Sequence, residues 1–300
     1  MGGDVVGWSL RSRVPAALAR LRASDLVDLV LPRQCGGCLR AGTDWCPRCA
    51  RALAGLAFDT IADGTAAARP TGTHAVRVGV PGSRMEGRPG GPGGPGGPGD
   101  GPGAGGGGPW VVPHPAPEGM PPVHAWGVYA DPLRAAVSAW KDAGRRDLLD
   151  VLSPLLAESL DGVLRGCGWQ DGVVLVVPAP SSRRAVRQRG DTPMEGLCRA
   201  AVEAVAGPSL PALRLAPALR HRRRVEDQSG LGTAERRGNL SGALEVKSLW
   251  DNVVRGRRCV LVDDVVTTGA TLAEAARALR RAGAGDVVGA SMAATQRTRG

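Results

Sequence analysis

The sequence predicts an α/β fold with a mostly parallel sheet over residues 123–295, on three observations. Residues 173–180 and 258–266 are continuous apolar runs rich in β-branched side chains, typical of strands buried on both faces of a parallel sheet. Segments with helical spacing of apolar residues alternate with these runs, as in βαβ units. The 300 residues are 43% apolar and 22% charged, which is ordinary for a globular chain with a buried core.

The elements of this domain are expected in a regular order. A strand at 124–130 is followed by a helix over 131–140. Asp131 is predicted to cap that helix and Pro132 to occupy its first turn, where a missing N–H costs nothing. Further helices are expected at 146–164, 193–206 and 272–283, and further strands at 173–180, 258–266 and 286–294.

A Gly/Pro-rich insertion is expected to precede the domain. The chain holds 45 Gly and 24 Pro, and residues 81–122 concentrate them. Such a segment buries too little apolar surface to offset its chain entropy, so we predict a disordered linker. Its Gly-Gly-Pro triplets resemble collagen, but about four repeats are too few for a triple helix.

Residues 1–33 are predicted to contain an amphipathic helix that packs on the body of the protein, with binding to a membrane surface as the alternative. Arg20, Arg22, Asp25 and Asp28 interrupt the apolar run that a secretion signal needs. The chain also has no run of about 18 apolar residues, so no membrane span is expected. We therefore expect a cytoplasmic protein with reduced thiols.

Residues 34–57 carry two CxxC pairs separated by seven residues. Four thiolates at the tips of two tight turns fill a tetrahedral coordination shell, which predicts a structural Zn²⁺ site in a zinc ribbon. An iron–sulfur cluster or two redox pairs are the alternatives. The predicted ligands are Cys35, Cys38, Cys46 and Cys49, whereas Cys167, Cys198 and Cys259 are expected to be small core residues.

The formal net charge of +10 favours partners that carry phosphate, such as nucleotides or nucleic acid. The alternative is a set of solvated arginine faces. Residues 220–224 (RHRRR) are the densest cationic run and lie in a polar stretch that reaches Asn239. This run is expected to be a mobile lid over a reacting centre, a grip on a nucleic acid backbone, or a solvated loop. His221 within it is a possible acid or base.

The segment 260–272 (VLVDDVVTTGATL) combines an apolar strand, two carboxylates, a Thr/Gly loop and the start of a helix. Loop amides and a helix N-terminus bind anions, and ligands of open α/β sheets lie beyond the carboxyl ends of the strands. Carboxylates would repel a phosphate but accept hydrogen bonds from sugar hydroxyls or hold Mg²⁺ through water. The sequence therefore predicts a site for a ribose 5-phosphate unit.

This segment resembles the signature of type I phosphoribosyltransferases. The resemblance implies that Asp263 and Asp264, the residues we assign to catalysis, contact the ribose hydroxyls. It also implies that a loop holds the 5′-phosphate, comprising Thr267, Thr268, Gly269, Ala270 and Thr271. In this fold the loop after the preceding buried strand binds pyrophosphate, here Ser181, Ser182 and Arg183. Lys141 is either a point charge for a phosphate or a cation at a helix C-terminus.

The order of motifs further resembles the ComF family, over 26–57 and 123–295. The cysteine pairs are followed by DPL with Lys141-Asp142, by VPAPSSR at 177–183, by DQSGL at 227–231 and by the signature. The family implies a zinc ribbon attached to a type I phosphoribosyltransferase fold, and a link to uptake of single-stranded DNA in natural transformation. The chain departs from the family in its Gly/Pro insertion and in Asp191-Thr192-Pro193, where many members have an aromatic residue, Asn and Gln.

The sequence thus favours an enzyme that binds phosphoribosyl pyrophosphate with Mg²⁺ and transfers the phosphoribosyl group to an unknown acceptor. Positioning and charge neutralisation would do most of the work. Since the chain has one Tyr and one Phe, Trp126 and Trp140 are the candidates for stacking on a base. The alternative is a non-catalytic protein that binds a phosphoribosyl ligand and single-stranded DNA, with a competence helicase as a possible partner.

Overall fold

The computed structural model of the chain describes residues 33–60, 66–67, 110–180, 192–205, 210–222 and 242–295. The predicted N-terminal helix and most of the predicted linker lie outside these ranges. Within them, no helix has both the length and the apolar character that crossing a bilayer requires.

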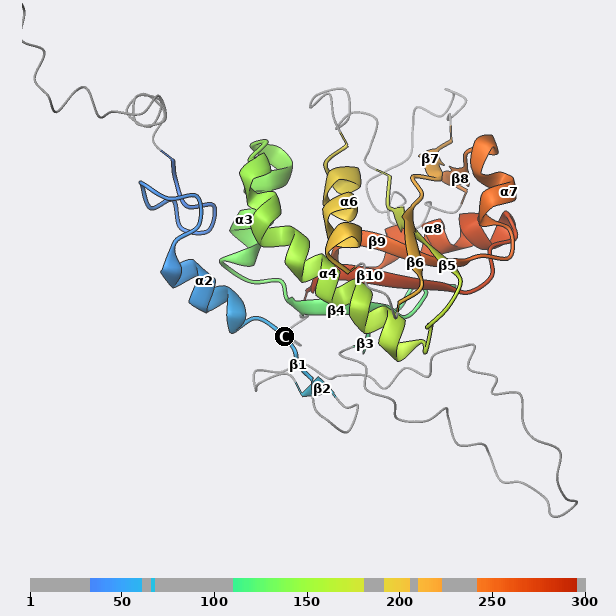
Figure 1. The fold of residues 1–300 in the computed structure, drawn as a ribbon, viewed down its shortest axis with the longest axis horizontal. Coiled ribbons are helices and arrows are strands. Elements are labelled where there is room, and N and C mark those ends of the chain that lie inside the picture. Colours follow the sequence, from blue (N-terminus) through green and yellow to red (C-terminus); the bar gives the residue numbers. More distant parts are fainter. Residues whose placement is uncertain are drawn as a thin grey trace, which may run out of the picture.

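A six-stranded sheet forms the centre of the fold (Figure 1). The strand order is β3-β4-β10-β9-β5-β6. The strands β4, β10, β9, β5 and β6 are parallel to one another, and β3 pairs antiparallel with β4 at the edge. The mostly parallel α/β fold predicted from the sequence is confirmed. The strand bounds are β3 Trp110–Val111, β4 Val123–Val128, β5 Val173–Pro178, β6 Ala212–Leu215, β9 Arg258–Val266 and β10 Val287–Ala294.

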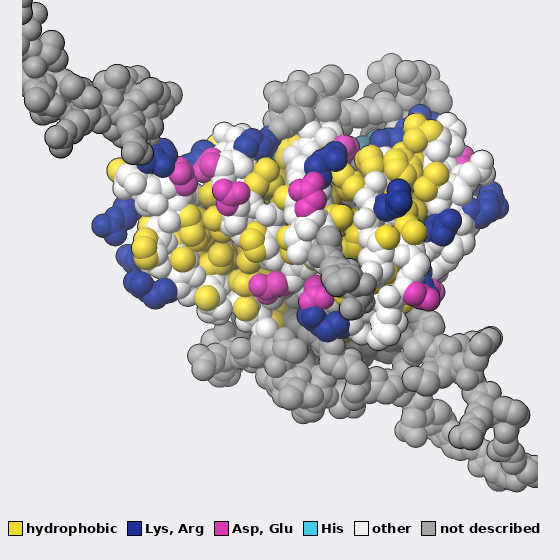
Figure 2. All heavy atoms as spheres, in the orientation of Figure 1, with side chains coloured by type: hydrophobic (Ala, Val, Ile, Leu, Met, Phe, Trp, Pro, Cys, Tyr) yellow, Lys and Arg dark blue, Asp and Glu magenta, His cyan; other side chains and the backbone are white. Residues whose placement is uncertain are grey.

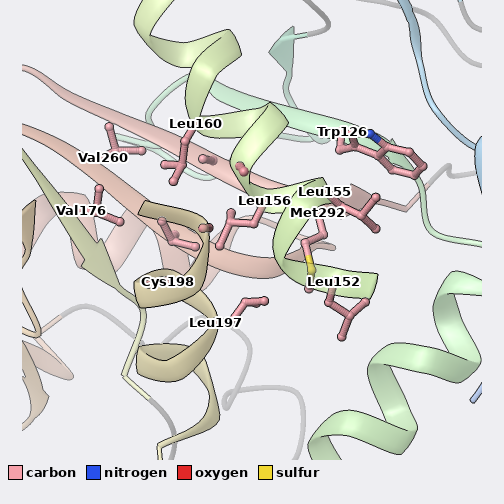
Figure 3. Close-up of a cluster of buried hydrophobic side chains, with 14 of the residues drawn as sticks. Trp126, Leu152, Leu155, Leu156, Leu160, Val176, Leu197, Cys198, Val260 and Met292 are labelled. Atoms are coloured by element: carbon pink, nitrogen blue, oxygen red, sulfur yellow. The ribbon is translucent and has the colours of Figure 1, made fainter. Parts of the chain in front are cut away.

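Helices cover both faces of the sheet, and the strands alternate their side chains between them. Val176 of β5 packs in one hydrophobic cluster with α3, α4 and α6, while its neighbour Val177 packs in a second cluster with α7 and α8. Figure 3 shows part of the first cluster, where Leu160 of α4 lies near Val260 of β9. The bounds are α3 Leu133–Asp142, α4 Leu149–Gly166, α6 Pro193–Val205, α7 Asp251–Val254 and α8 Ala270–Arg281, with 3-10 turns η2 Arg146–Leu148 and η4 Ser248–Trp250.

The start of α3 differs from the prediction. The helix begins at Leu133, with Pro132 in the cap position and no side-chain cap bond. Asp131 instead forms an ion pair with Arg134 one turn along, at an exposed surface. The carboxylate that the sequence assigns to the cap is therefore used within the first turn.

The sheet also begins earlier than predicted, because β3 lies inside the segment assigned to the linker. Trp110 and Val111 pair with His124 and Val123 at the edge of β4. The ring of Trp110 meets the buried ring of His124 edge-on, with the centroids 5.7 Å apart. The C-terminal end of the segment assigned to the linker therefore contributes an edge strand to the sheet.

The cysteine-rich segment packs on the sheet and on the start of two helices. Its helix α2 (Pro47–Ala54) is followed by residues that continue along the edge of β4, where Phe58 N donates to Trp126 O and Val128 N donates to Leu56 O. Two short strands follow, β1 (Asp59–Thr60) and β2 (Ala66–Ala67). Between the cysteines, a Cβ at Gly36 would lie 2.5 Å from the side chain of Leu148, and one at Gly37 would lie 2.8 Å from Pro132. Both glycines are needed for this close approach.

Candidate functional site

The loop between β9 and α8 lies at the carboxyl edge of the parallel sheet. Gly269 precedes the helix with φ of 75°, in the left-handed region that glycine adopts without strain. Thr267, Thr268 and Thr271 are exposed around it. Thr268 Oγ1 accepts a 3.4 Å hydrogen bond from Ala270 N. The first turn of α8 thus presents backbone N–H groups and the positive end of a helix dipole beside three hydroxyls, a favourable seat for an anion.

Asp263 and Asp264 lie near the carboxyl end of β9, a few residues before this loop. The side chain of Asp264 is 8% exposed, and its Oδ2 lies 2.6 Å from the ammonium nitrogen of Lys141. Asp263 Oδ1 accepts a hydrogen bond from Asp264 N at 3.0 Å. Burial, and then the neighbouring charge of Asp264, raise the pKa of Asp263 well above its usual range. The structure therefore joins the predicted acid pair to Lys141 in one cluster.

The predicted pyrophosphate residues Ser181, Ser182 and Arg183 lie outside the described residues, but the strand that leads to them is next to β9. Pro178 pairs with Val262, and Ala179 N donates to Val262 O at 2.8 Å. The described end of this segment is therefore one strand away from Asp263.

A hairpin of β7 (Leu219–His221) and β8 (Leu244–Val246) lies beside these two loops. His221 Nε2 lies 3.2 Å from the carbonyl oxygen of Pro180, to which it donates a hydrogen bond. Buried Glu274 of α8 accepts from Leu244 N at 2.8 Å, while Arg277 binds both Glu274 and Leu244 O. Helix α8 therefore holds the end of this strand pair at which Leu244 pairs with His221.

The cationic run in this hairpin is partly neutralised. Arg220 and Arg222 both pair with Glu245 on the opposite strand, at 2.9 and 3.5 Å. The remaining Arg223 and Arg224 lie outside the described residues. The two described arginines therefore interact with a carboxylate and do not form an uncompensated basic patch.

The aromatic residues near the site differ from those suggested by the sequence. Trp140 is fully buried, and Trp126 is 9% exposed with Nε1 donating to Glu158 Oε2 at 2.7 Å. Neither can stack on a ligand, so that suggestion was wrong. Tyr129, which the sequence reasoning missed, is half-buried just after β4, and burial and then Asp264 raise its pKa. The sequence signal that could have identified it is its position directly after a strand that ends at the same edge of the sheet.

The four cysteines of the N-terminal segment form a separate cluster. The sulfurs of Cys35, Cys38, Cys46 and Cys49 all lie within 4.8 Å of one another. The sulfurs of Cys38 and Cys46 are 3.7 Å apart, close to the ~3.8 Å edge of a tetrahedron with metal–sulfur bonds of about 2.3 Å. Burial opposes ionisation of Cys35, but N–H groups including that of Cys46 lower its pKa to about 6. These thiols fit a four-coordinate metal.

The chain is similar to proteins of known family. The family model described as "Phosphoribosyl transferase domain" matches residues 221–299. The DNA utilization protein YhgH of Escherichia coli O157:H7 is 32% identical over 167 residues, which are 53% of this chain and 66% of that protein. The YhgH proteins of Escherichia coli K12 and Shigella flexneri give the same values, so the match spans just under two thirds of these relatives' length. A solved structure described as "Structure of the allosteric regulatory enzyme of purine biosynthesis" is 21% identical, with a TM-score of 0.30, and the match covers 49% of this chain and 25% of that chain.

The parallel sheet, the acid pair at the end of β9 and the Thr-rich loop before α8, together with the matched domain, make the chain similar to proteins of the phosphoribosyltransferase type. Among such proteins the chain resembles the ComF family in its order of motifs, and it is 32% identical to the YhgH proteins over 53% of its length. The resemblance drawn from the sequence is thereby confirmed.

Proposed function

We propose that the chain binds phosphoribosyl pyrophosphate, or a nucleotide with a ribose 5-phosphate unit, together with Mg²⁺ and transfers the phosphoribosyl group to an acceptor. The observation that supports this most strongly is the run from Asp263 through Gly269 into α8. It joins two carboxylates to an exposed hydroxyl-lined anion seat at the carboxyl edge of the sheet.

Each part of this run has a role in the proposal. The N–H groups and hydroxyls of residues 267–271 bind the 5′-phosphate. Asp263 and Asp264 accept hydrogen bonds from the ribose hydroxyls, which orients the C1 carbon. Ser181, Ser182 and Arg183 are proposed to hold the pyrophosphate. The pyrophosphate leaves C1 as the acceptor nitrogen forms its bond to C1. Bound Mg²⁺ would neutralise charge on the departing pyrophosphate, and the two aspartates would contact it through water.

The four-cysteine cluster is proposed to bind Zn²⁺ in a structural role. Four sulfur ligands leave no coordination position for a substrate. The cluster sits where Gly36 and Gly37 pack against Leu148 and Pro132. The metal would therefore hold the ribbon against the start of α3 and α4.

A link to DNA is proposed from the relatives, which are described as DNA utilization proteins. The chain carries a net charge of +10, and Arg48 and Arg51 of α2 are exposed. Figure 2 shows basic side chains at the end of the molecule where α2 lies. The second candidate function is therefore a non-catalytic protein of the DNA-uptake machinery that binds the same phosphoribosyl ligand and single-stranded DNA, with a helicase as a possible partner.

Binding of the proposed ligand is tested by calorimetric titration of phosphoribosyl pyrophosphate into the protein. One titration contains Mg²⁺, and a second contains a chelator and no Mg²⁺. Binding that needs Mg²⁺ is expected, and no binding in either condition contradicts the proposal. Release of pyrophosphate with a panel of bases and amines then separates the two candidates. Release supports the transferase, whereas tight binding without release with every acceptor supports the binding protein.

A further inference from the structure

Lys141 forms an ion pair with Asp264 in which the two partners differ in exposure to solvent. Helix α3 brings its ammonium nitrogen to 2.6 Å from Asp264 Oδ2. The lysine side chain is 35% exposed, whereas the aspartate side chain is 8% exposed. The ammonium can thus return to solvent, but the carboxylate cannot.

The backbone that carries Lys141 is held firmly. Its neighbour Trp140 is fully buried in the first hydrophobic cluster, and Arg146 Nη1 donates to the carbonyl oxygen of Trp140 at 2.6 Å. The helix therefore fixes the base of the lysine stem, and motion of the charge is left to the flexible four-carbon chain.

The other buried carboxylate among the described ion pairs shows a contrasting arrangement. Glu274 accepts from Arg277 and from Leu244 N, so its partners form a rigid, multiply bonded unit within the fold. Lysine is a compact point charge with rotatable donors, which suits a partner that must be exchanged. The residue type at position 141 is notable because Lys141 and Lys247 are the two lysines among 38 basic residues.

We propose that Lys141 is a displaceable counter-ion that makes the acid pair selective for a phosphorylated sugar over a free divalent cation; this rests on the proposed function. Before ligand binding, the ammonium neutralises Asp264 and disfavours a cation at this carboxylate by repulsion. When the ligand arrives, its ribose hydroxyls replace the ammonium at Asp264. The ammonium then moves to a phosphate oxygen of the ligand.

The test of this proposal measures cation binding without any phosphoribosyl ligand. Mn²⁺ alone is titrated into the zinc-loaded protein and followed by its electron paramagnetic resonance signal. Lys141→Met is expected to bind Mn²⁺ about tenfold more tightly than the unaltered protein, the scale of a charged contact. Lys141→Gln also removes the charge but keeps a hydrogen-bond donor, and we expect the same gain in Mn²⁺ affinity from it. It replaces Lys141→Met in the experiment if that variant does not fold.

Three controls locate the effect. Adding Asp264→Asn to the Lys141 variant should abolish the gained Mn²⁺ affinity, and Lys141→Arg should restore the weak binding of the unaltered protein. Arg134→Met breaks an exposed ion pair on the same helix and should change nothing. If neither neutral variant gains Mn²⁺ affinity, or if the gain survives Asp264→Asn, the counter-ion role is contradicted.

A second arm uses phosphoribosyl pyrophosphate with Mg²⁺, for which Lys141→Met should lose about tenfold in affinity. Unchanged affinity would contradict the transfer of the ammonium to a phosphate. Failure of the unaltered protein to bind this ligand would refute the proposed function, while the Mn²⁺ arm would still report on the counter-ion.

Discussion

A Cβ atom built on Gly269 would lie 2.2 Å from the sulfur of Met120. The glycine before α8 is therefore in direct contact with the C-terminal end of the segment that the sequence assigns to the linker. Arg280 near the far end of the same helix donates to Gly119 O at 2.6 Å. Residues 110–122 thus brace the helix that begins at the phosphate loop.

This contact sets the limits of a tolerated deletion. Removing residues 81–108 is expected to change the melting temperature by only about 1–2 °C, because loop-closure entropy varies slowly with length. Removing 81–120 also deletes β3 and the contacts of Gly119 and Met120, and should lower it by about 4–8 °C. Differential scanning calorimetry compares the two deletions, and equal melting temperatures would show that residues 110–120 do not brace the site.

Replacing Gly269 with Val is expected to destabilise the protein and to abolish binding of a phosphoribosyl ligand. The left-handed backbone alone costs about 1–2 kcal/mol for a residue with a side chain, and contact with Met120 adds to this cost. Gly168→Val is the matched control, since Gly168 also has a positive φ but no atom within 4 Å of its Cβ position. Urea denaturation should show a larger loss for Gly269→Val, and equal losses would count against the contact.

One zinc per chain is expected by elemental analysis. Structural zinc contributes roughly 10–16 kcal/mol in small isolated sites, so its removal should unfold the ribbon. Cys38→Ser should lower the zinc content to below one per chain, whereas Cys167→Ala, which lies outside the cluster, should leave it at one. Iron in place of zinc, or full zinc content in Cys38→Ser, would contradict the assignment.

The pH dependence of stability should report on Asp263. Burial and the charge of Asp264 raise its pKa to about 8, so the folded state holds this proton more tightly than the unfolded chain does. Its contribution to stability is complete below the unfolded value of about 4 and is lost as pH rises to about 8. Asp263→Asn is neutral at every pH, so its stability relative to the unaltered protein should increase from pH 4 to pH 8 and then level off. Urea denaturation at several pH values checks this. A difference in the free energy of unfolding that stays constant from pH 4 to pH 8 would contradict a raised pKa at Asp263.

Much of the fold followed from local patterns in the sequence. The buried strands β5 and β9 are continuous apolar runs, and the acid pair and Thr/Gly loop follow β9 within a few residues. The four cysteines were predictable for the same reason, because CxxC spacing brings the two sulfurs of each pair together and the two pairs are only seven residues apart. These features need no knowledge of the tertiary structure.

Other parts depended on contacts between distant residues. Lys141 meets Asp264 only because α3 and β9 pack together, and nothing near either residue specifies that pair. The burial of Trp126 and Trp140 likewise results from packing, as does the position of Tyr129 beside the acid pair. The strand β3 was missed because two residues beside a Gly-rich run give no periodic pattern.

The central claim is most directly tested by titrating phosphoribosyl pyrophosphate with Mg²⁺ into the unaltered protein, Asp264→Asn and Asp171→Asn. Asp264→Asn keeps the shape of the side chain but removes its charge, and a hydrogen bond to a charged group contributes about 1.5–3 kcal/mol. We therefore expect a loss of roughly tenfold to a hundredfold in affinity. Asp171 is exposed at the opposite edge of the sheet, just before β5, so Asp171→Asn should bind as the unaltered protein does. Absence of binding by the unaltered protein, or equal affinity in all three proteins, would contradict the assignment of this site.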